Sequence, residues 1–288
     1  MLSRALSLLE LLHPDGIAIR SLVLGSRCPA MLRPCSSMTA SEYADLVILA
    51  PTAAECRTSG WLQETAQSVN QKLESNGVAY VLAPPRWRLQ ITKLLSDHGF
   101  SIDQAIVHLP DQGSSRYLVP LSPIPAQYTF AKLLPLPRWG RLSAAVALRF
   151  LGYGFFWRIL PSIGLVIRRP GARPLFEWLF RLNPQTDRSG SVIIRTSWRG
   201  QDGAVILHRF VEGDDSPSAV AKMNLTTKTR GNLIREAEIL DRIGPSARTA
   251  GAQVPLRLSL GQVNEHPDRK STRLNSSHIQ KSRMPSSA

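Results

Sequence analysis

Two uninterrupted apolar runs limit the folds that this chain can adopt. Residues 45–50 read DLVILA, residues 78–83 read VAYVLA, and a proline follows each run. Short continuous runs of this kind are typical of strands buried on both faces, because helices cover a parallel sheet on both sides. Between the runs, residues 60–74 repeat apolar side chains with the period of a helix. Strand, helix and strand in this order predict an α/β fold with a parallel sheet.

The flanking segments extend this layout. Asn76-Gly77 predicts a left-handed cap at the end of the helix at 60–74, and Gly99 predicts the end of a second helix. A short turn at 111–113 joins the last two strands, which predicts an antiparallel hairpin. The further expected elements are a short helix at 2–12, strands at 17–24, 101–109 and 114–121, and a helix at 87–97.

The layout of residues 43–121 resembles the second half of a class I, S-adenosylmethionine-dependent methyltransferase domain, and NGVAYV at 76–81 fits the glycine before that family's fifth strand. The resemblance implies a partial Rossmann-like sheet. The family also has a glycine-rich turn whose backbone N–H groups meet the cofactor, whereas LVLGSR at 22–27 offers a single glycine. We therefore favour a structural domain over residues 1–121 that binds no S-adenosylmethionine, with methyl transfer as an alternative.

Three polar residues of this domain are interpreted as structural. One stands at the start of a strand, one at the end of a helix and one inside a strand, and none belongs to a catalytic or metal-binding motif. They are Asp45, His98 and His108.

Residues 122–185 are predicted to be a proline-rich linker followed by apolar helices. Five prolines between 120 and 137 favour an extended chain over 120–138. The apolar stretch 142–167 carries Arg149 and Arg158 on opposite faces of a helix, so neither a membrane span nor an interfacial helix results. We expect two helices that pack on the α/β domain, and a short helix at 175–182. Peripheral membrane contact remains the alternative, through four flanking arginines, Arg138, Arg141, Arg168 and Arg169.

A strand that ends in lysine precedes a helix with an internal glutamate. Residues 219–222 read AVAK and residues 235–240 read REAEIL, after two further predicted strands at 191–197 and 204–211. A strand can present an ammonium group to phosphates, and a carboxylate from a neighbouring helix can hold that flexible ammonium in place. A last strand is expected at 254–260.

This segment, 186–267, resembles the small lobe of the aminoglycoside-phosphotransferase and choline-kinase branch of the protein-kinase-like fold, an α+β lobe. The resemblance implies that Lys222 contacts the α/β-phosphates of ATP and that Glu236 orients Lys222. Glu236 is favoured over Glu238 because the family's glutamate lies four residues before a leucine, here Leu240. Two glycines in the turn at 198–203 would cover the phosphates, although a simple hairpin turn explains them equally well: Gly200 and Gly203.

The catalytic half of such an enzyme has no counterpart in this sequence. Phosphoryl transfer of this type needs an aspartate that accepts the hydroxyl proton, and an Asn and an Asp that hold Mg²⁺. No HxDxxxxN pattern follows Glu238. We therefore expect a fragment that is inactive by itself, whose intact parent uses ATP and Mg²⁺ to phosphorylate a hydroxyl of a small molecule or sugar. A non-catalytic pseudokinase or scaffold is the alternative.

Residues 268–288 are predicted to be a disordered tail of artefactual origin. The string DRKSTRLNSSH at 268–278 is what a common short-read sequencing adapter encodes in frame, so we expect the natural sequence to depart near Pro267. Without the tail's five basic residues and one acidic residue, the formal charge falls from +14 to +10.

The remaining basic charge does not predict a nucleic-acid partner, because no motif that reads bases accompanies it. The chain has three cysteines, an odd number, and their spacing is not that of metal ligands, which favours a reduced cytoplasmic protein. If the four flanking arginines contact a membrane, the protein would be membrane-peripheral. The apolar segment at residues 1–12 is too short for a signal peptide, and it carries Glu10.

Overall fold

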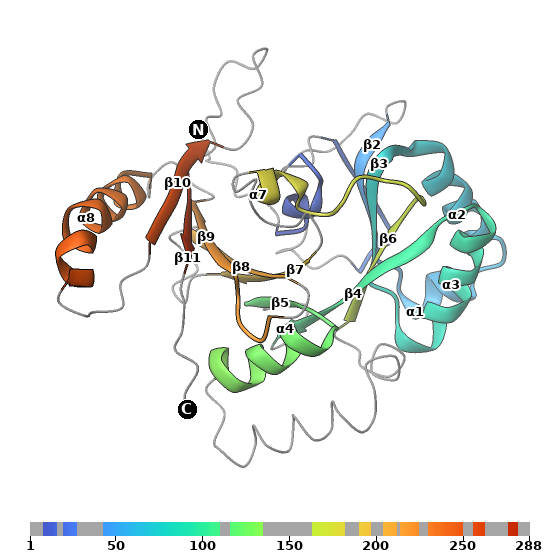
Figure 1. Cartoon of the computed structure of the whole chain (residues 1–288). Helices are drawn as coiled ribbons and strands as arrows, with labels where there is room; N and C mark the ends of the chain where they lie inside the picture. Colours follow the sequence, from blue (N-terminus) through green and yellow to red (C-terminus); the bar gives the residue numbers. More distant parts are fainter. Residues whose placement is uncertain are drawn as a thin grey trace. The chain divides into compact units, whose positions relative to one another are not determined.

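A computed structural model of the chain contains two compact units (Figure 1). One unit spans Leu6–Leu175 and the other runs from Phe176 onward. Each combines a sheet with helices, so the α/β class is confirmed at this general level. The structure describes residues 8–15, 20–27, 43–109, 116–134, 163–181, 190–196, 204–211, 214–224, 230–249, 256–262 and 276–281.

The N-terminal unit is built on a mixed sheet. Its first three strands are parallel, as predicted. The next strand in space, β6, is antiparallel to both of its neighbours, and β4 and β5 form the predicted antiparallel hairpin. The spatial order is β1 (Ser21–Leu24), β2 (Ala44–Leu49), β3 (Leu73–Val81), β6 (Ile163–Arg168), β4 (Ser101–Leu109) and β5 (Tyr117–Pro120).

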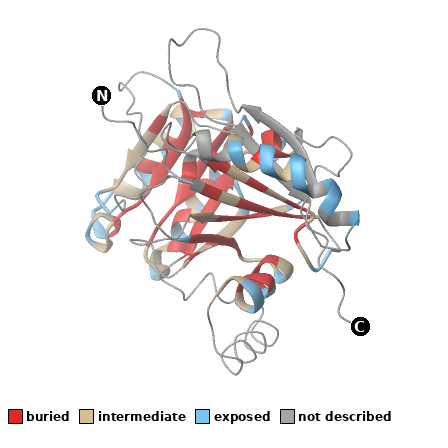
Figure 2. Ribbon diagram, turned by 90° about the vertical axis from the view of Figure 1, so that its left-hand side faces the viewer, coloured by how far each residue is buried: buried red, intermediate tan, exposed pale blue. Residues whose placement is uncertain are grey.

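Three helices follow the parallel strands, α1 (Ala53–Arg57), α2 (Trp61–Lys72) and α3 (Pro85–Asp97), and a 3-10 turn at Leu8–Leu12 precedes them. Pro85 is tolerated at the first position of α3, and Gly99 ends that helix with a φ of +82°. Alternate residues of β2, β3 and β6 pack against α2 and α3 in one apolar core, and buried positions concentrate on the strands (Figure 2). This core includes Val47, Leu49, Val69, Val81, Ile91, Leu95 and Leu165.

The central strand β6 was predicted to be helix, and that prediction is wrong for residues 163–168. The segment reads IGLVIR, and its first five residues are buried, which suits a strand covered on both faces. A Cβ atom on Gly164 would lie 2.2 Å from Tyr80 Oη, so only glycine lets the Tyr80 side chain cross β6. Since β6 lies inside the sheet, the N-terminal unit extends to Leu175, beyond the predicted domain end at residue 121. Residues 135–162, also predicted as linker and helices, lie outside the described residues.

Two further predictions are also wrong, the helix cap at Asn76-Gly77 and the extended chain over residues 123–133. Asn76-Gly77 lies within β3 and caps no helix, because α2 already ends at Lys72 and continues directly into the strand. Gly77 is needed there for space, since an added Cβ would lie 2.7 Å from Leu73 Cδ1. The proline-rich stretch after β5 forms α4 (Pro123–Tyr128) and a π-helical turn (Thr129–Leu133), because prolines are accepted in the first turn of a helix.

In its described residues, the C-terminal unit contains an antiparallel sheet and the helices α7 (Glu177–Arg181) and α8 (Arg230–Thr249). Its first strands form a meander in the predicted positions. Helix α8 contains residues 235–240, which were expected on a helix, and continues past Pro245. The spatial order of the strands is β7 (Ser191–Thr196), β8 (Ala204–Phe210), β9 (Ala219–Asn224), β11 (Ser276–Lys281) and β10 (Leu256–Gln262).

Strand β11 lies inside the tail that was predicted to be disordered, and for residues 276–281 that prediction is wrong. The strand pairs with β9, where His278 is the register partner of Lys222, and with β10. Backbone hydrogen bonds to β9 on one side and to β10 on the other hold this strand with little demand on its side chains, which explains how a polar segment fits here. The adapter origin of the tail stays a prediction.

Candidate functional site

Lys222 and Glu236 meet between β9 and α8. Lys222 Nζ donates a hydrogen bond to Glu236 Oε2. The two side chains are 34% and 38% exposed, so the ion pair is accessible to a ligand. The structure therefore brings together the two residues that the sequence analysis singled out.

The alternation of buried and partly exposed side chains along β9 explains on which face of the sheet Lys222 lies. Ala219, Ala221 and Met223 are buried, while Val220 and Lys222 are partly exposed. Because successive side chains of a strand face opposite sides, Lys222 lies on the more open face of the sheet. On α8, Ala237 is buried, Glu236 is half-buried and Glu238 is exposed, so Glu236 is the carboxylate that reaches Lys222.

The strands beside Lys222 add an apolar surface to its face. In the register of β8 and β9, Ile206 pairs with Lys222 and His208 with Val220, and directly paired residues share a face. Ile206 and Val220 are partly exposed. Burial, assisted by Arg195, lowers the pKa of His208 to about 4, so this imidazole is neutral near pH 7. The face thus offers an ammonium group next to apolar and uncharged side chains.

Gly200 and Gly203, the other predicted phosphate-binding residues, lie outside the described residues. The hairpin that they connect is present, because Thr196 of β7 pairs with Val205 of β8. Among the residues that the structure describes, no group of three or more His, Cys, Asp or Glu side chains is placed to hold a metal ion.

In the N-terminal unit, the predicted structural residues have intramolecular partners. Asp45, at the start of β2, accepts hydrogen bonds from Arg20 N and Arg20 Nη2, both at 2.9 Å. His108 is fully buried, and its Nε2 lies 2.7 Å from Tyr80 Oη. His98 ends α3, and its N–H donates to Leu95 O at 3.1 Å.

The turn after β1 is the place where a methyltransferase-like domain would meet its cofactor. Here the backbone N–H of Ser26 donates to the Glu55 carboxylate, at 3.1 and 3.3 Å from its two oxygens. Thr52 also donates to Glu55 through its N–H and its hydroxyl. Burial raises the pKa of Glu55, but these hydrogen bonds outweigh it and the net pKa lies below its ordinary value. The Ser26 amide is therefore already bonded to a carboxylate of the same chain.

Two of the four arginines considered for membrane contact are held within the N-terminal unit. Arg168 Nη2 donates to Asp103 Oδ1 at 2.5 Å. The Arg169 guanidinium lies 4.6 Å from the centroid of the Phe100 ring and donates to Asn70. The other two, Arg138 and Arg141, lie outside the described residues.

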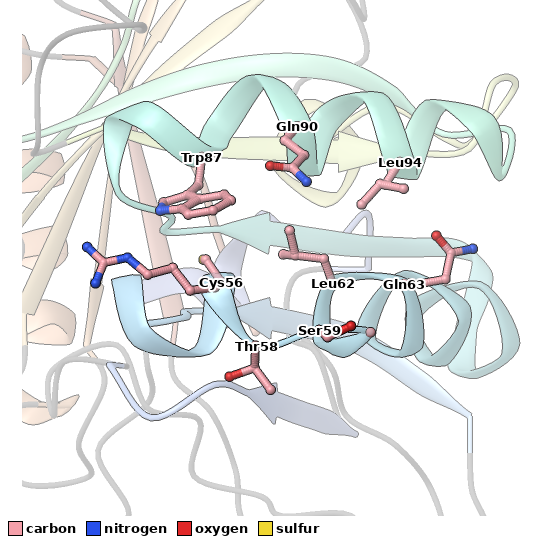
Figure 3. A pocket seen from close by; sticks show the side chains of 10 residues that line it. Cys56, Thr58, Ser59, Leu62, Gln63, Trp87, Gln90 and Leu94 are labelled. Atoms are coloured by element: carbon pink, nitrogen blue, oxygen red, sulfur yellow. The ribbon is translucent and has the colours of Figure 1, made fainter.

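Sequence reasoning missed one feature, a cleft of about 450 Å³ between α3 and the α1–α2 pair (Figure 3). Its walls come from α3, from the α1–α2 pair and from the turn 58–60 that joins that pair, and no motif marks them. The only signal was the expected pair of helices at 60–74 and 87–97, which carry Leu62, Gln63, Trp87, Gln90 and Leu94.

Comparisons with known proteins do not assign the chain to a group: no protein-family model matches the sequence, and no curated protein matches it. None of the described helices is long and apolar enough to cross a membrane. The functional assignment consequently rests on the residues of the site.

Proposed function

We propose that the C-terminal unit is the nucleotide-binding lobe of an ATP-dependent phosphotransferase of the aminoglycoside-phosphotransferase type. In this proposal Lys222 binds the α/β-phosphates and Glu236 orients Lys222. The N-terminal unit is proposed as a structural, Rossmann-like domain of the methyltransferase type. The observation that carries the proposal is the bond between Lys222 Nζ and Glu236 Oε2.

The chemistry of the pair supports phosphate binding. A lysine side chain is long and flexible, and the carboxylate of Glu236 restricts it to one position. The exposed fractions of both side chains leave the ammonium within reach of a second anion. The partly exposed Ile206 and Val220, on the same face, supply the apolar surface that the base of a nucleotide needs.

The binding of the nucleotide is proposed separately from the transfer of its phosphoryl group. The catalytic aspartate and the metal ligands of such an enzyme are proposed to belong to the intact parent, in which a hydroxyl of a small molecule or sugar accepts the γ-phosphoryl group. The chain itself is proposed to bind adenine nucleotide without transferring phosphate. For the parent, we expect Lys222→Met to abolish turnover.

Calorimetric titration of the full chain with ATP and Mg²⁺ tests the proposal. We expect binding that Lys222→Met removes and that Glu236→Gln weakens by about tenfold, the loss of roughly 1.4 kcal/mol of binding free energy. Glu238→Gln is the matched control, because Glu238 is an exposed glutamate of the same helix. Equal affinity of the wild type and Lys222→Met for ATP would refute the role of Lys222.

A further inference from the structure

The register of β7, β8 and β9 places a second cation on the face of the sheet that carries Lys222. These three strands are neighbours in the sheet (Figure 1). Ile206 of β8 pairs with Lys222 of β9 on one side and with Arg195 of β7 on the other. Because directly paired residues share a face, the three side chains form one row across the sheet. The Cα atoms of Arg195 and Lys222 are about 10 Å apart, since neighbouring strands are about 4.8 Å apart.

This row is the open part of the face. Its three side chains are all partly exposed, whereas in the next row Ile193 of β7 and its partner His208 of β8 are buried. The Arg195 guanidinium acts on the same face. Burial is the main cause of the low pKa of His208, and the charge of Arg195 adds to it, which places the guanidinium near this imidazole.

The two cations of the row can bind different parts of one polyphosphate. Lysine and arginine side chains are long, so the ammonium and the guanidinium can both reach over Ile206, which lies between them. Lys222 is held by its bond to Glu236. Arg195 stands one residue before the end of β7, next to the turn at 198–203 that was predicted to cover the phosphates. A guanidinium is a planar fork of donors that matches the oxygens of a phosphate group.

We propose that Arg195 binds the terminal phosphate of the nucleotide and makes the site prefer a triphosphate to a diphosphate. This inference rests on the nucleotide binding proposed above, in which Lys222 holds the α/β-phosphates. Arg195 donates hydrogen bonds to the γ-phosphate oxygens, while the base lies along Ile206 and Val220. In the intact parent, the diphosphate product lacks this contact with Arg195 and dissociates more readily.

Titration calorimetry of the full chain with ATP and with ADP, at one Mg²⁺ concentration, tests the proposal. We expect the wild type to bind ATP about tenfold more tightly than ADP, as one charge-assisted contact provides. Arg195→Gln should lower the affinity for ATP by about tenfold and leave that for ADP unchanged. Arg195→Lys gives a second measurement if Arg195→Gln does not fold. We expect an intermediate preference for ATP from it, because lysine keeps the charge and lacks the planar fork.

Arg242→Gln is the matched control, because Arg242 is an exposed arginine on α8 of the same unit, and it should keep the preference for ATP. Equal affinities of the wild type for ATP and ADP, or a preference that both Arg195 substitutions leave unchanged, overturn the role of Arg195 and leave that of Lys222 intact. Absence of binding of either nucleotide overturns the proposed function and this inference together.

Discussion

Two bonded pairs of polar side chains, one from each unit of the chain, differ in their surroundings. In the N-terminal unit, Tyr80 and His108 are both fully buried and share a hydrogen bond of 2.7 Å. In the C-terminal unit, Lys222 and Glu236 are joined while each remains more than one-third exposed. A buried pair must satisfy itself, because no ligand or water reaches it, whereas an accessible charged pair keeps capacity for a further partner.

The sequence context already differs between the pairs. Tyr80 and His108 lie on separate strands with β6 between them, and the contact depends on the space that Gly164 leaves. Lys222 and Glu236 lie on consecutive elements, and fourteen residues separate them. The buried pair therefore depends on the whole sheet, while the exposed pair needs only a strand and the helix that follows it. Changes at Tyr80 or His108 should consequently lower stability, whereas changes at Lys222 or Glu236 should mainly weaken ligand binding.

The largest effect is expected from His108→Ala. The change leaves a cavity in a fully buried site and removes the partner of the Tyr80 hydroxyl. We expect the free energy of unfolding to fall by about 3–5 kcal/mol. Urea unfolding, followed by hydrogen exchange of peptides from β3 and β4, measures this free energy of unfolding within the N-terminal unit. His98→Ala, at the end of α3, is the control and should cost much less. A loss as small as that of the control would show that the buried pair does not stabilise the sheet.

A pH titration should reveal the second-largest effect, in the C-terminal unit. Burial lowers the pKa of His208 from 6.5 to about 4 in the folded state, so the unfolded chain binds more protons below pH 6.5. Stability from this group is complete above pH 6.5 and is lost as the pH falls toward 4, by on the order of 1.4 kcal/mol per pH unit. His13 adds to the same trend in the N-terminal unit, since burial also lowers its pKa.

Hydrogen exchange of β8 peptides between pH 7.5 and pH 4.5 checks the contribution of His208. His208→Gln should flatten the dependence in the C-terminal unit and leave that of the N-terminal unit unchanged. An unaltered slope in the His208→Gln protein would contradict the assignment.

Tyr80→Phe separates the hydrogen bond of the buried pair from its packing. The ring stays in place, and only the hydroxyl that faces His108 Nε2 is removed. We expect a loss of about 1–2 kcal/mol in the free energy of unfolding, less than for His108→Ala, because no large cavity forms. The same hydrogen-exchange measurement on β3 and β4 applies. A loss equal to that of His108→Ala would assign the whole effect to the hydrogen bond.

The sequence predicted local features well and long-range ones poorly. Buried strands such as 45–50 and the hairpin of β4 and β5 follow from short patterns within one or two elements, and the Lys222–Glu236 contact was expected from the resemblance to a kinase-like lobe. The position of β6 does not, because residues 163–168 reach the centre of the sheet only by pairing with β3 and β4, far away in the sequence. The same reason applies to Tyr80 and His108 and to the cleft beside Trp87. Strand β11 differs again, since its pairing comes from backbone hydrogen bonds to β9 and β10 more than from a pattern in its own sequence.

The smallest effect on stability is expected at the exposed pair. Glu236→Gln removes the ion pair with Lys222, and partly exposed pairs of this kind contribute about 0–1 kcal/mol to folding. The same substitution should weaken ATP binding by about tenfold, so its cost appears in the ligand complex and not in the free protein. Urea unfolding with and without ATP and Mg²⁺ measures both quantities on one sample. A large loss of stability without nucleotide would place Lys222 and Glu236 in the same structural role as Tyr80 and His108, and would remove the distinction between the two pairs.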